Sequence, residues 1–240
     1  MDESLKFLIL LFYYERPEIV KGALESIAAS HYKNYEVAFI DDSEDYKPGK
    51  AVYRQFLYKE GSSNLYCHTE DTQEAKLARG GSLFGAAANA IMLASDADVV
   101  IPLCDDDRLT PWYLGQLNKF YTDHPEIMYS YCDVIIHDPS VEDWKDTLSR
   151  SNPEHFLNIN HNPHPGGNSK DSSQMSFRMG CIKEGGARWL APLTACLDFH
   201  MWNSLCNLYG VAHFNGTIGQ VKAYWAKQLG GRGNTYGNTE

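Results

Sequence analysis

The sequence lacks cysteines in a Cys-x-x-Cys spacing, and its six cysteines are scattered along 240 residues. This scatter excludes a zinc knuckle or a small disulfide scaffold and favours reduced, buried thiols. The continuously apolar residues 7–12 are far too few to span a bilayer. The residues before them do not have the pattern of a secretory signal. We therefore expect a cytoplasmic protein, with peripheral attachment to a membrane left open.

Basic residues are in the minority, because 21 Lys and Arg stand against 31 Asp and Glu, for a formal charge of −10. This balance argues against direct nucleic-acid binding, which normally needs a basic surface. It is compatible with an anionic ligand held through a divalent ion. The first apolar run is not followed by a glycine-rich loop with a subsequent Arg and Lys, which argues against a nucleotidyltransferase. No internal repeat is present, and the length suits one large domain.

Apolar runs at residues 7–12 and 35–40 are typical of strands buried on both faces of a parallel sheet. Between them, residues 18–30 place their apolar side chains on one helical face. This strand-helix-strand order predicts a right-handed βαβ unit. The further expected helices cover residues 51–59, 86–94, a segment after Pro111 and a segment ending near 209. The further expected strands cover residues 64–68, 99–103, 127–136, 173–179, 211–214 and 221–225.

Two later segments differ in character from the rest of the chain. Residues 138–172 have few periodic apolar positions, and a stretch of this length predicts a functional loop or lid. Its three histidines suggest zinc, but their spacing makes surface histidines the better interpretation. The glycine-rich residues 229–240 predict a mobile tail.

Three consecutive carboxylates, Asp105, Asp106 and Asp107, follow an apolar run. Adjacent acids repel one another unless a cation or hydrogen-bond donors offset them. Oxygen ligands at the end of a strand are what Mg²⁺ or Mn²⁺ would use. The alternative is an acidic loop that caps the next helix. Because Asp41 and Asp42 end another strand in the same way, and ligands of open α/β sheets lie at such strand ends, we favour a binding site.

Several stretches, in this order along residues 5–210, resemble the inverting glycosyltransferases of family 2. They are Tyr13-Tyr14-Glu15-Arg16-Pro17, Ala23-Leu24-Glu25-Ser26-Ile27, Tyr32-Lys33-Asn34-Tyr35-Glu36-Val37, Asp41-Asp42-Ser43, Gly85-Ala86-Ala87-Ala88-Asn89-Ala90, Cys104-Asp105-Asp106-Asp107-Arg108-Leu109-Thr110-Pro111, Gln174-Met175-Ser176-Phe177-Arg178 and Leu197-Asp198-Phe199-His200-Met201-Trp202. The resemblance implies an α/β protein with the GT-A fold, a Rossmann-like nucleotide-diphospho-sugar transferase domain. Its single mixed, mostly parallel sheet would be flanked by helices. One domain would span residues 1–240, with a nucleotide-binding half at 1–110 and an acceptor-binding half at 111–240.

The function implied by this resemblance is metal-dependent, inverting transfer of a sugar, of the hexosyl type, to a hydroxyl group. The donor would be a nucleotide-sugar, with a UDP-sugar favoured over a GDP-sugar, and the acceptor a glycan, a lipid-linked glycan or another hydroxyl compound. At the position of the family's DxD-type motif, Mn²⁺ or Mg²⁺ would lie on Asp106, with Asp107 or Asp105 assisting directly or through water. A metal there would stabilise the charge that grows on the diphosphate leaving group.

The resemblance also assigns the turn of Tyr13, Tyr14, Glu15 and Arg16 to the nucleotide pocket. Either tyrosine would stack on the base, and the alternative for each is a half-buried turn aromatic. The resemblance gives Asp41 or Asp42 hydrogen bonds to the base or ribose. We consider a phosphate contact for Arg79, whose alternative is a solvated charge at a helix end.

Inverting transfer needs a base to take the proton of the acceptor hydroxyl, and the resemblance points to Asp198. Its alternative role is to cap the following helix, and His200 and His213 are weaker candidates. Two positions depart from the family pattern: Cys104 stands where the first Asp of the DxD motif would fall, and Leu197 replaces the acid before Asp198. These departures support an alternative function, a non-catalytic GT-A-like protein that binds a nucleotide or a glycan.

Overall fold

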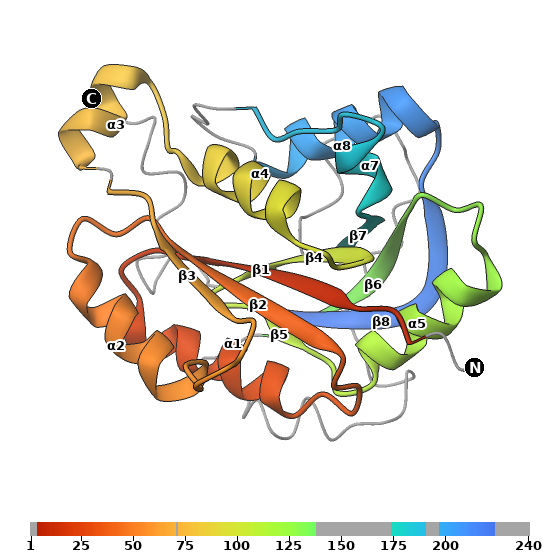
Figure 1. Cartoon of the computed structure of the whole chain (residues 1–240), viewed down its shortest axis with the longest axis horizontal. Coiled ribbons are helices and arrows are strands. Elements are labelled where there is room, and N and C mark those ends of the chain that lie inside the picture. Colours follow the sequence, from red (N-terminus) through yellow and green to blue (C-terminus); the bar gives the residue numbers. More distant parts are fainter. Residues whose placement is uncertain (1–3, 71, 138–173, 191–196, 224–240) are drawn as a thin grey trace.

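A computed structural model describes residues 4–70, 72–137, 174–190 and 197–223, which form one sheet with helices on both faces (Figure 1). The strands are β1 Phe7–Tyr13, β2 Tyr35–Asp41, β3 Leu65–His68, β4 Val99–Cys104, β5 Arg108–Leu109, β6 Tyr129–His137, β7 Met175–Arg178 and β8 His213–Ala223. The helices are α1 Pro17–Ala28, α2 Tyr46–Phe56, α3 Gln73–Arg79, α4 Phe84–Ala94, α5 Tyr113–Asp123, α7 Gly180–Lys183 and α8 Leu197–Tyr209. The predicted α/β class is confirmed.

Within the described residues, the strands form a single sheet in the order β3-β2-β1-β4-β7-β6-β8-β5. β3, β2, β1 and β4 are parallel, so the pairing expected between residues 7–12 and 35–40 is confirmed. β7 is antiparallel to β4 and β6, whereas β8 is parallel to β6 and antiparallel to β5. The sheet is therefore mixed, and its four adjacent parallel strands come from the amino-terminal half of the chain.

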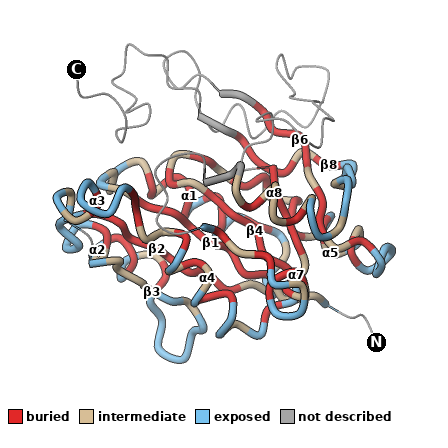
Figure 2. The backbone as a smooth tube through the Cα atoms, turned by 90° about the horizontal axis from the view of Figure 1, so that it is seen from above, coloured by how far each residue is buried: buried red, intermediate tan, exposed pale blue. Residues whose placement is uncertain are grey.

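β1 is buried along its whole length, as its unbroken apolar sequence predicts. Because side chains alternate along a strand, Ile9 and Leu11 pack against the helices α1, α2 and α5, while Leu8 and Leu10 pack against α4, α7 and α8. Figure 2 shows buried residues concentrated along these central strands and exposed residues at the outer helices and turns. Two apolar cores thus hold β1 rigidly between them.

The carboxyl-terminal strands differ from the prediction. The sequence predicted two strands, at residues 211–214 and 221–225, but β8 is one strand that pairs with β6 on both sides of an irregularity. Gly216 lies there with a φ of 73°, which only glycine adopts freely. The sequence around Gly216 therefore resembles a turn between two strands. In the structure, the residues of β8 that have no partner in β6 form a bulge within one continuous ladder. The prediction of two strands was wrong.

The helix predicted at residues 51–59 begins earlier, at Tyr46, because Asp45 accepts a hydrogen bond from the backbone N–H of Lys47 at 3.0 Å. Pro48 falls in the first turn, where proline is tolerated. Gly49 permits a close approach to β2, since a Cβ atom there would lie 2.2 Å from Oδ2 of Asp41. α3 was not predicted at all; Thr72 caps its amino end by accepting from the N–H of Ala75 at 3.1 Å.

The predicted loop at residues 138–172 and the predicted tail at 229–240 lie outside the described residues. Within the parts of the chain that the structure describes, no helix combines the length and apolar character needed to cross a bilayer.

Candidate functional site

The loops that follow four parallel strands meet at one edge of the sheet. Tyr13, the last residue of β1, lies opposite Asp41 at the end of β2, and Asp41 lies opposite His68 at the end of β3. On the other side of β1, Phe12 lies opposite Cys104, which ends β4. Both acidic clusters singled out in the sequence therefore occupy the same edge, where open α/β sheets bind their ligands.

Arg16 connects the loop after β1 to the acidic turn after β4. Its Nε donates to Oδ2 of Asp105 at 3.2 Å, and its Nη1 donates to Oδ2 of Asp106 at 2.8 Å. Its Nη2 also pairs with Oδ1 of Asp105, which completes a two-pronged contact. The backbone N–H of Tyr14 donates to Asp105 at 3.1 Å. Asp105 thus holds the turn after β1 against the end of β4. This is the turn that the sequence predicts to line a nucleotide pocket.

Asp105 and Asp106 differ in their surroundings. Asp105 is buried, and this burial raises its pKa to about 7, with Arg16 acting against the rise and Asp106 adding to it. The Asp106 side chain retains 20 % exposure. Arg16 thus offsets part of the negative charge of the turn.

The turn after β1 is held in an uncommon backbone conformation. Glu15 has a φ of 49°, in the left-handed region that costs free energy for any residue other than glycine. Its backbone N–H donates to Oγ of Ser43 at 3.0 Å, which ties this turn to the loop after β2. Glu15 is exposed, whereas Tyr14 and Arg16 are half-buried. The strained turn therefore presents these two residues at the edge of the sheet.

Sequence reasoning missed a buried ion pair that Asp42 forms with Lys76 of α3. The Nζ of Lys76 lies 2.7 Å from Oδ2 of Asp42, and the two side chains are 1 % and 0 % exposed. Ser82 donates to the same carboxylate at 2.9 Å and Thr69 at 2.6 Å. The Nζ of Lys76 also lies 4.8 Å from the ring centre of Tyr14. No pattern marks Lys76 in the sequence, because a lysine on a short helix is usually solvated.

Asp41 is equally buried and has different partners. It accepts from the Tyr66 hydroxyl at 2.6 Å and from the backbone N–H of Ser43 at 2.9 Å. Burial raises the pKa of Asp41, and these hydrogen bonds act against the rise. Tyr13 lies in the core, with its ring centroid 5.1 Å from that of Phe39. The structure thus gives Tyr13 the packing role and leaves Tyr14 as the ring at the edge.

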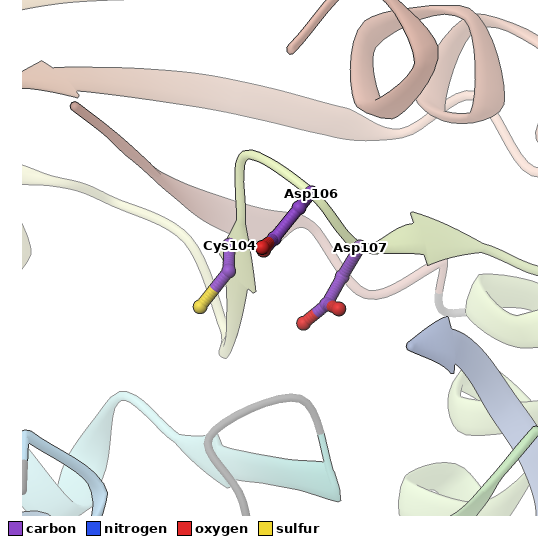
Figure 3. A group of neighbouring side chains, drawn as sticks. All are labelled: Cys104, Asp106 and Asp107. Carbon is purple, nitrogen blue, oxygen red and sulfur yellow. The ribbon is translucent and has the colours of Figure 1, made fainter. Parts of the chain in front are cut away.

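Cys104, Asp106 and Asp107 form a group of potential metal ligands whose donor atoms all lie within 4.8 Å of one another. Figure 3 shows them around the turn between β4 and β5, with the carboxyl group of Asp106 directed toward Cys104. A backbone hydrogen bond of 3.1 Å from the Asp107 N–H to the Cys104 carbonyl closes this turn. The two carboxylates suit Mn²⁺ or Mg²⁺, and the sulfur is a softer donor. The donor set fits a divalent cation, with one thiol in the place of an oxygen ligand.

Arg79 lies in the last turn of α3, with its side chain exposed. Its Nη2 donates to the carbonyl of Gly81 at 3.0 Å. This position agrees with the alternative given in the sequence analysis, in which Arg79 is a solvated charge at the end of a helix. A phosphate contact of Arg79 stays a prediction.

Asp198 is the second residue of α8, and its side chain lies outside the described part of the chain. The far end of α8 lies beside the amino end of β4: the Tyr129 hydroxyl donates to the carbonyl of Gly210, and Tyr129 pairs with Phe177, which pairs with Val100. The role of Asp198 as base stays a prediction.

Comparison by sequence finds no relatives, because no protein-family model and no curated protein matches the chain. Comparison by structure finds glycosyltransferases. The fold is similar to that of S. aureus TarS residues 1–349, with a TM-score of 0.63 and 14 % identity over 91 % of this chain and 60 % of that one. The same fragment in complex with UDP-GlcNAc gives a TM-score of 0.61 and 14 % identity, over 92 % of this chain and 59 % of that one.

The fold is also similar to that of the mannosyltransferase PcManGT from Pyrobaculum calidifontis in complex with GDP-Man and Mn²⁺. That match has a TM-score of 0.58 and 13 % identity, over 96 % of this chain and 59 % of that one. The chain thus spans about three fifths of the length of these structures. At such identities the comparisons establish the fold, and the GT-A architecture expected from the sequence is confirmed.

Proposed function

We propose that this protein is a glycosyltransferase that moves a sugar from a nucleoside-diphosphate donor to a hydroxyl acceptor with inversion, in the manner of family 2. The observation that carries the proposal is the meeting of Arg16, the buried Asp41 and Asp42, and the turn of Asp105 to Asp107 at one edge of a GT-A sheet. Similar folds are seen in complex with UDP-GlcNAc and with GDP-Man and Mn²⁺, which supports a nucleotide-sugar as donor.

In this proposal the nucleotide lies over the turn after β1. Tyr14 offers its half-buried ring to the base, with Lys76 behind it. Asp41 and Asp42 are both 0 % exposed and fix protein partners, Tyr66 and Lys76 respectively. The pocket is thereby preorganised before the donor binds. A hydrogen bond from either aspartate to the base or ribose stays part of the proposal.

A divalent ion held by Asp106 and Asp107, when bound, would neutralise the negative charge of the diphosphate group. Arg16 keeps the acidic turn in place through Asp105 and contributes a positive charge of its own. Asp198 takes the proton of the acceptor hydroxyl as the oxygen attacks the anomeric carbon, and the nucleoside diphosphate departs from the opposite face. Its place in the first turn of α8 supports this role, since a helix amino terminus favours the ionised carboxylate.

A second function, binding of a nucleotide or glycan without transfer, is favoured by the residues at two positions. Cys104 replaces an expected carboxylate beside the acidic turn, and Leu197 replaces an acid beside Asp198. Both changes would weaken catalysis more than binding. The two functions differ in one observable, because only the transferase releases a nucleoside diphosphate from its donor.

A screen of UDP-sugars and GDP-sugars by thermal unfolding, with and without Mn²⁺, tests the proposed function. A donor at a hundredfold excess over its Kd should stabilise the fold by about 2.7 kcal/mol, or roughly 5–10 °C for a chain of this size. The donors that stabilise the protein are then incubated with it, with water standing in for the unidentified acceptor, and release of UDP or GDP by hydrolysis of the donor is measured. A shift followed by release supports the transferase, and a shift without release supports the binding protein.

The matched controls for this screen are Asp106→Ala and Asp96→Ala. Asp106→Ala should remove the part of the shift that depends on Mn²⁺. Asp96 has an 83 % exposed side chain paired with Lys6, and it precedes β4 at the amino edge of the sheet, so Asp96→Ala should keep the full shift. An undiminished Mn²⁺-dependent shift in Asp106→Ala would refute the metal assignment, and no shift with any donor would refute the proposed function.

A further inference from the structure

The acidic turn after β4 combines two kinds of metal-binding donor, and this combination bears on the choice of ion. Among the described residues, Cys104, Asp106 and Asp107 are the group of three such side chains whose donor atoms lie within 4.8 Å of one another. Asp105 is engaged elsewhere, with Arg16 and the N–H of Tyr14. A metal ion at this turn therefore meets one sulfur and two carboxylates.

The three donor atoms are close enough for one ion to collect them after side-chain adjustment. Bonds of about 2.3 Å to sulfur and about 2.0–2.2 Å to oxygen place neighbouring ligand atoms of one ion about 3.0–3.6 Å apart, and only ligands on opposite sides of the ion reach about 4.5 Å. The donor atoms lie within 4.8 Å of one another, so side-chain rotation brings them closer when an ion binds. Cys104 is also firmly placed, since its backbone belongs to the ladder between β1 and β4.

The chemistry of the donors then discriminates between ions. Mg²⁺ requires oxygen ligands in near-octahedral geometry and gains nothing from a thiolate, whereas Zn²⁺, Co²⁺ and Cd²⁺ bind sulfur well. An aspartate at position 104 would favour Mg²⁺ and Mn²⁺ instead. Because Arg16 contacts Asp106 through Oδ2 at 2.8 Å, any ion bound there shares that carboxylate with a guanidinium group, so the thiol is the donor that discriminates between ions.

We infer that Cys104 Sγ is a metal ligand alongside Asp106 and Asp107, and that this site prefers thiophilic divalent ions to Mg²⁺. The inference rests on the proposed function, because it concerns the metal of the same site. It changes the expected cofactor: Co²⁺, Zn²⁺ and Cd²⁺ bind most tightly, Mn²⁺ less tightly and Mg²⁺ least. Cys104 is then a determinant of metal specificity and not a loss of the metal site.

Cobalt spectroscopy on the full chain tests this inference without any assay of activity. Co²⁺ is titrated into the protein in reducing buffer, with and without UDP, and the near-ultraviolet charge-transfer band of a cobalt–thiolate bond is recorded. The wild type should show this band and should bind Cd²⁺ or Zn²⁺ at least about tenfold more tightly than Mg²⁺ by calorimetry. Cys104→Ser should lose the band and about tenfold in Cd²⁺ affinity, while its Mg²⁺ affinity changes little.

Two further variants make the outcome specific. Cys104→Asp should lose the band and should narrow the difference between Cd²⁺ and Mg²⁺ affinity. Cys67→Ser should keep the band, because Cys67 lies in β3 outside the cluster. Burial raises the pKa of Cys132 and Cys181 to about 12, so neither readily supplies a thiolate.

The inference is overturned if the wild type shows no cobalt–thiolate band, if Cys104→Ser keeps it, or if no ion binds with or without UDP. Its failure is distinct from that of the proposed function. A protein that releases UDP from a donor with Mg²⁺ alone and shows no band refutes the inference and keeps the transferase. A band without release of UDP or GDP from any donor keeps the inference and rejects the transferase.

Discussion

Asp198→Asn is expected to lower the rate of UDP or GDP release about 10²- to 10⁴-fold, because the amide has no carboxylate to take the acceptor proton. The substitution keeps the size of the side chain at the start of α8. Calorimetry should show donor binding within about threefold of wild type, since a general base acts in the transition state rather than on the bound donor. The rate is measured with whichever nucleotide-sugar the thermal screen identifies.

Asn207→Ala is the matched control for Asp198→Asn. Asn207 is exposed near the other end of the same helix, so its loss tests whether any polar substitution in α8 affects the rate. We expect its release rate to equal that of wild type. A fully active Asp198→Asn variant would remove Asp198 from the role of base, whereas an equal loss in both variants would indicate damage to α8.

Lys76→Met is expected to destabilise the fold by about 3–5 kcal/mol, because it leaves the Asp42 carboxylate buried without its cation. Water cannot replace the lost cation, because the two side chains are 1 % and 0 % exposed and their Nζ and Oδ2 atoms lie 2.7 Å apart. Methionine matches the lysine stem in length, so the lost charge rather than a cavity dominates the effect. Urea unfolding monitored by tryptophan fluorescence measures the change.

Two comparisons separate the buried charge from other causes. Lys119→Met removes a cation from an exposed pair with Asp123, and should cost no more than about 0.5 kcal/mol. Adding Asp42→Asn to Lys76→Met should restore about half of the lost stability, because the remaining amide is neutral and keeps the hydroxyl partners Ser82 and Thr69. A loss below about 1 kcal/mol in Lys76→Met would contradict the buried pair.

Much of the fold was predictable because its signals are local. The unbroken apolar run of β1 predicts a strand buried on both faces, and Pro17 predicts the start of α1. Errors arose where local signals were ambiguous. Gly216 resembles a turn but forms a bulge in β8, and Gly49 resembles a helix breaker but permits α2 to approach Asp41.

The sequence by itself determined which residues end the parallel strands, and with them the acidic clusters of Asp41–Asp42 and Asp105 to Asp107. This was possible because strand ends follow from nearby apolar and polar residues, and parallel strands bring those ends to one edge.

Only the tertiary structure decided how each carboxylate is used. It placed Asp105 under Arg16, Asp42 against Lys76 and Cys104 beside Asp106. The residues of the first two pairs are 89 and 34 positions apart in the chain. The burial of a charge and the choice of its partner depend on packing between distant segments, and no local pattern in the sequence records them.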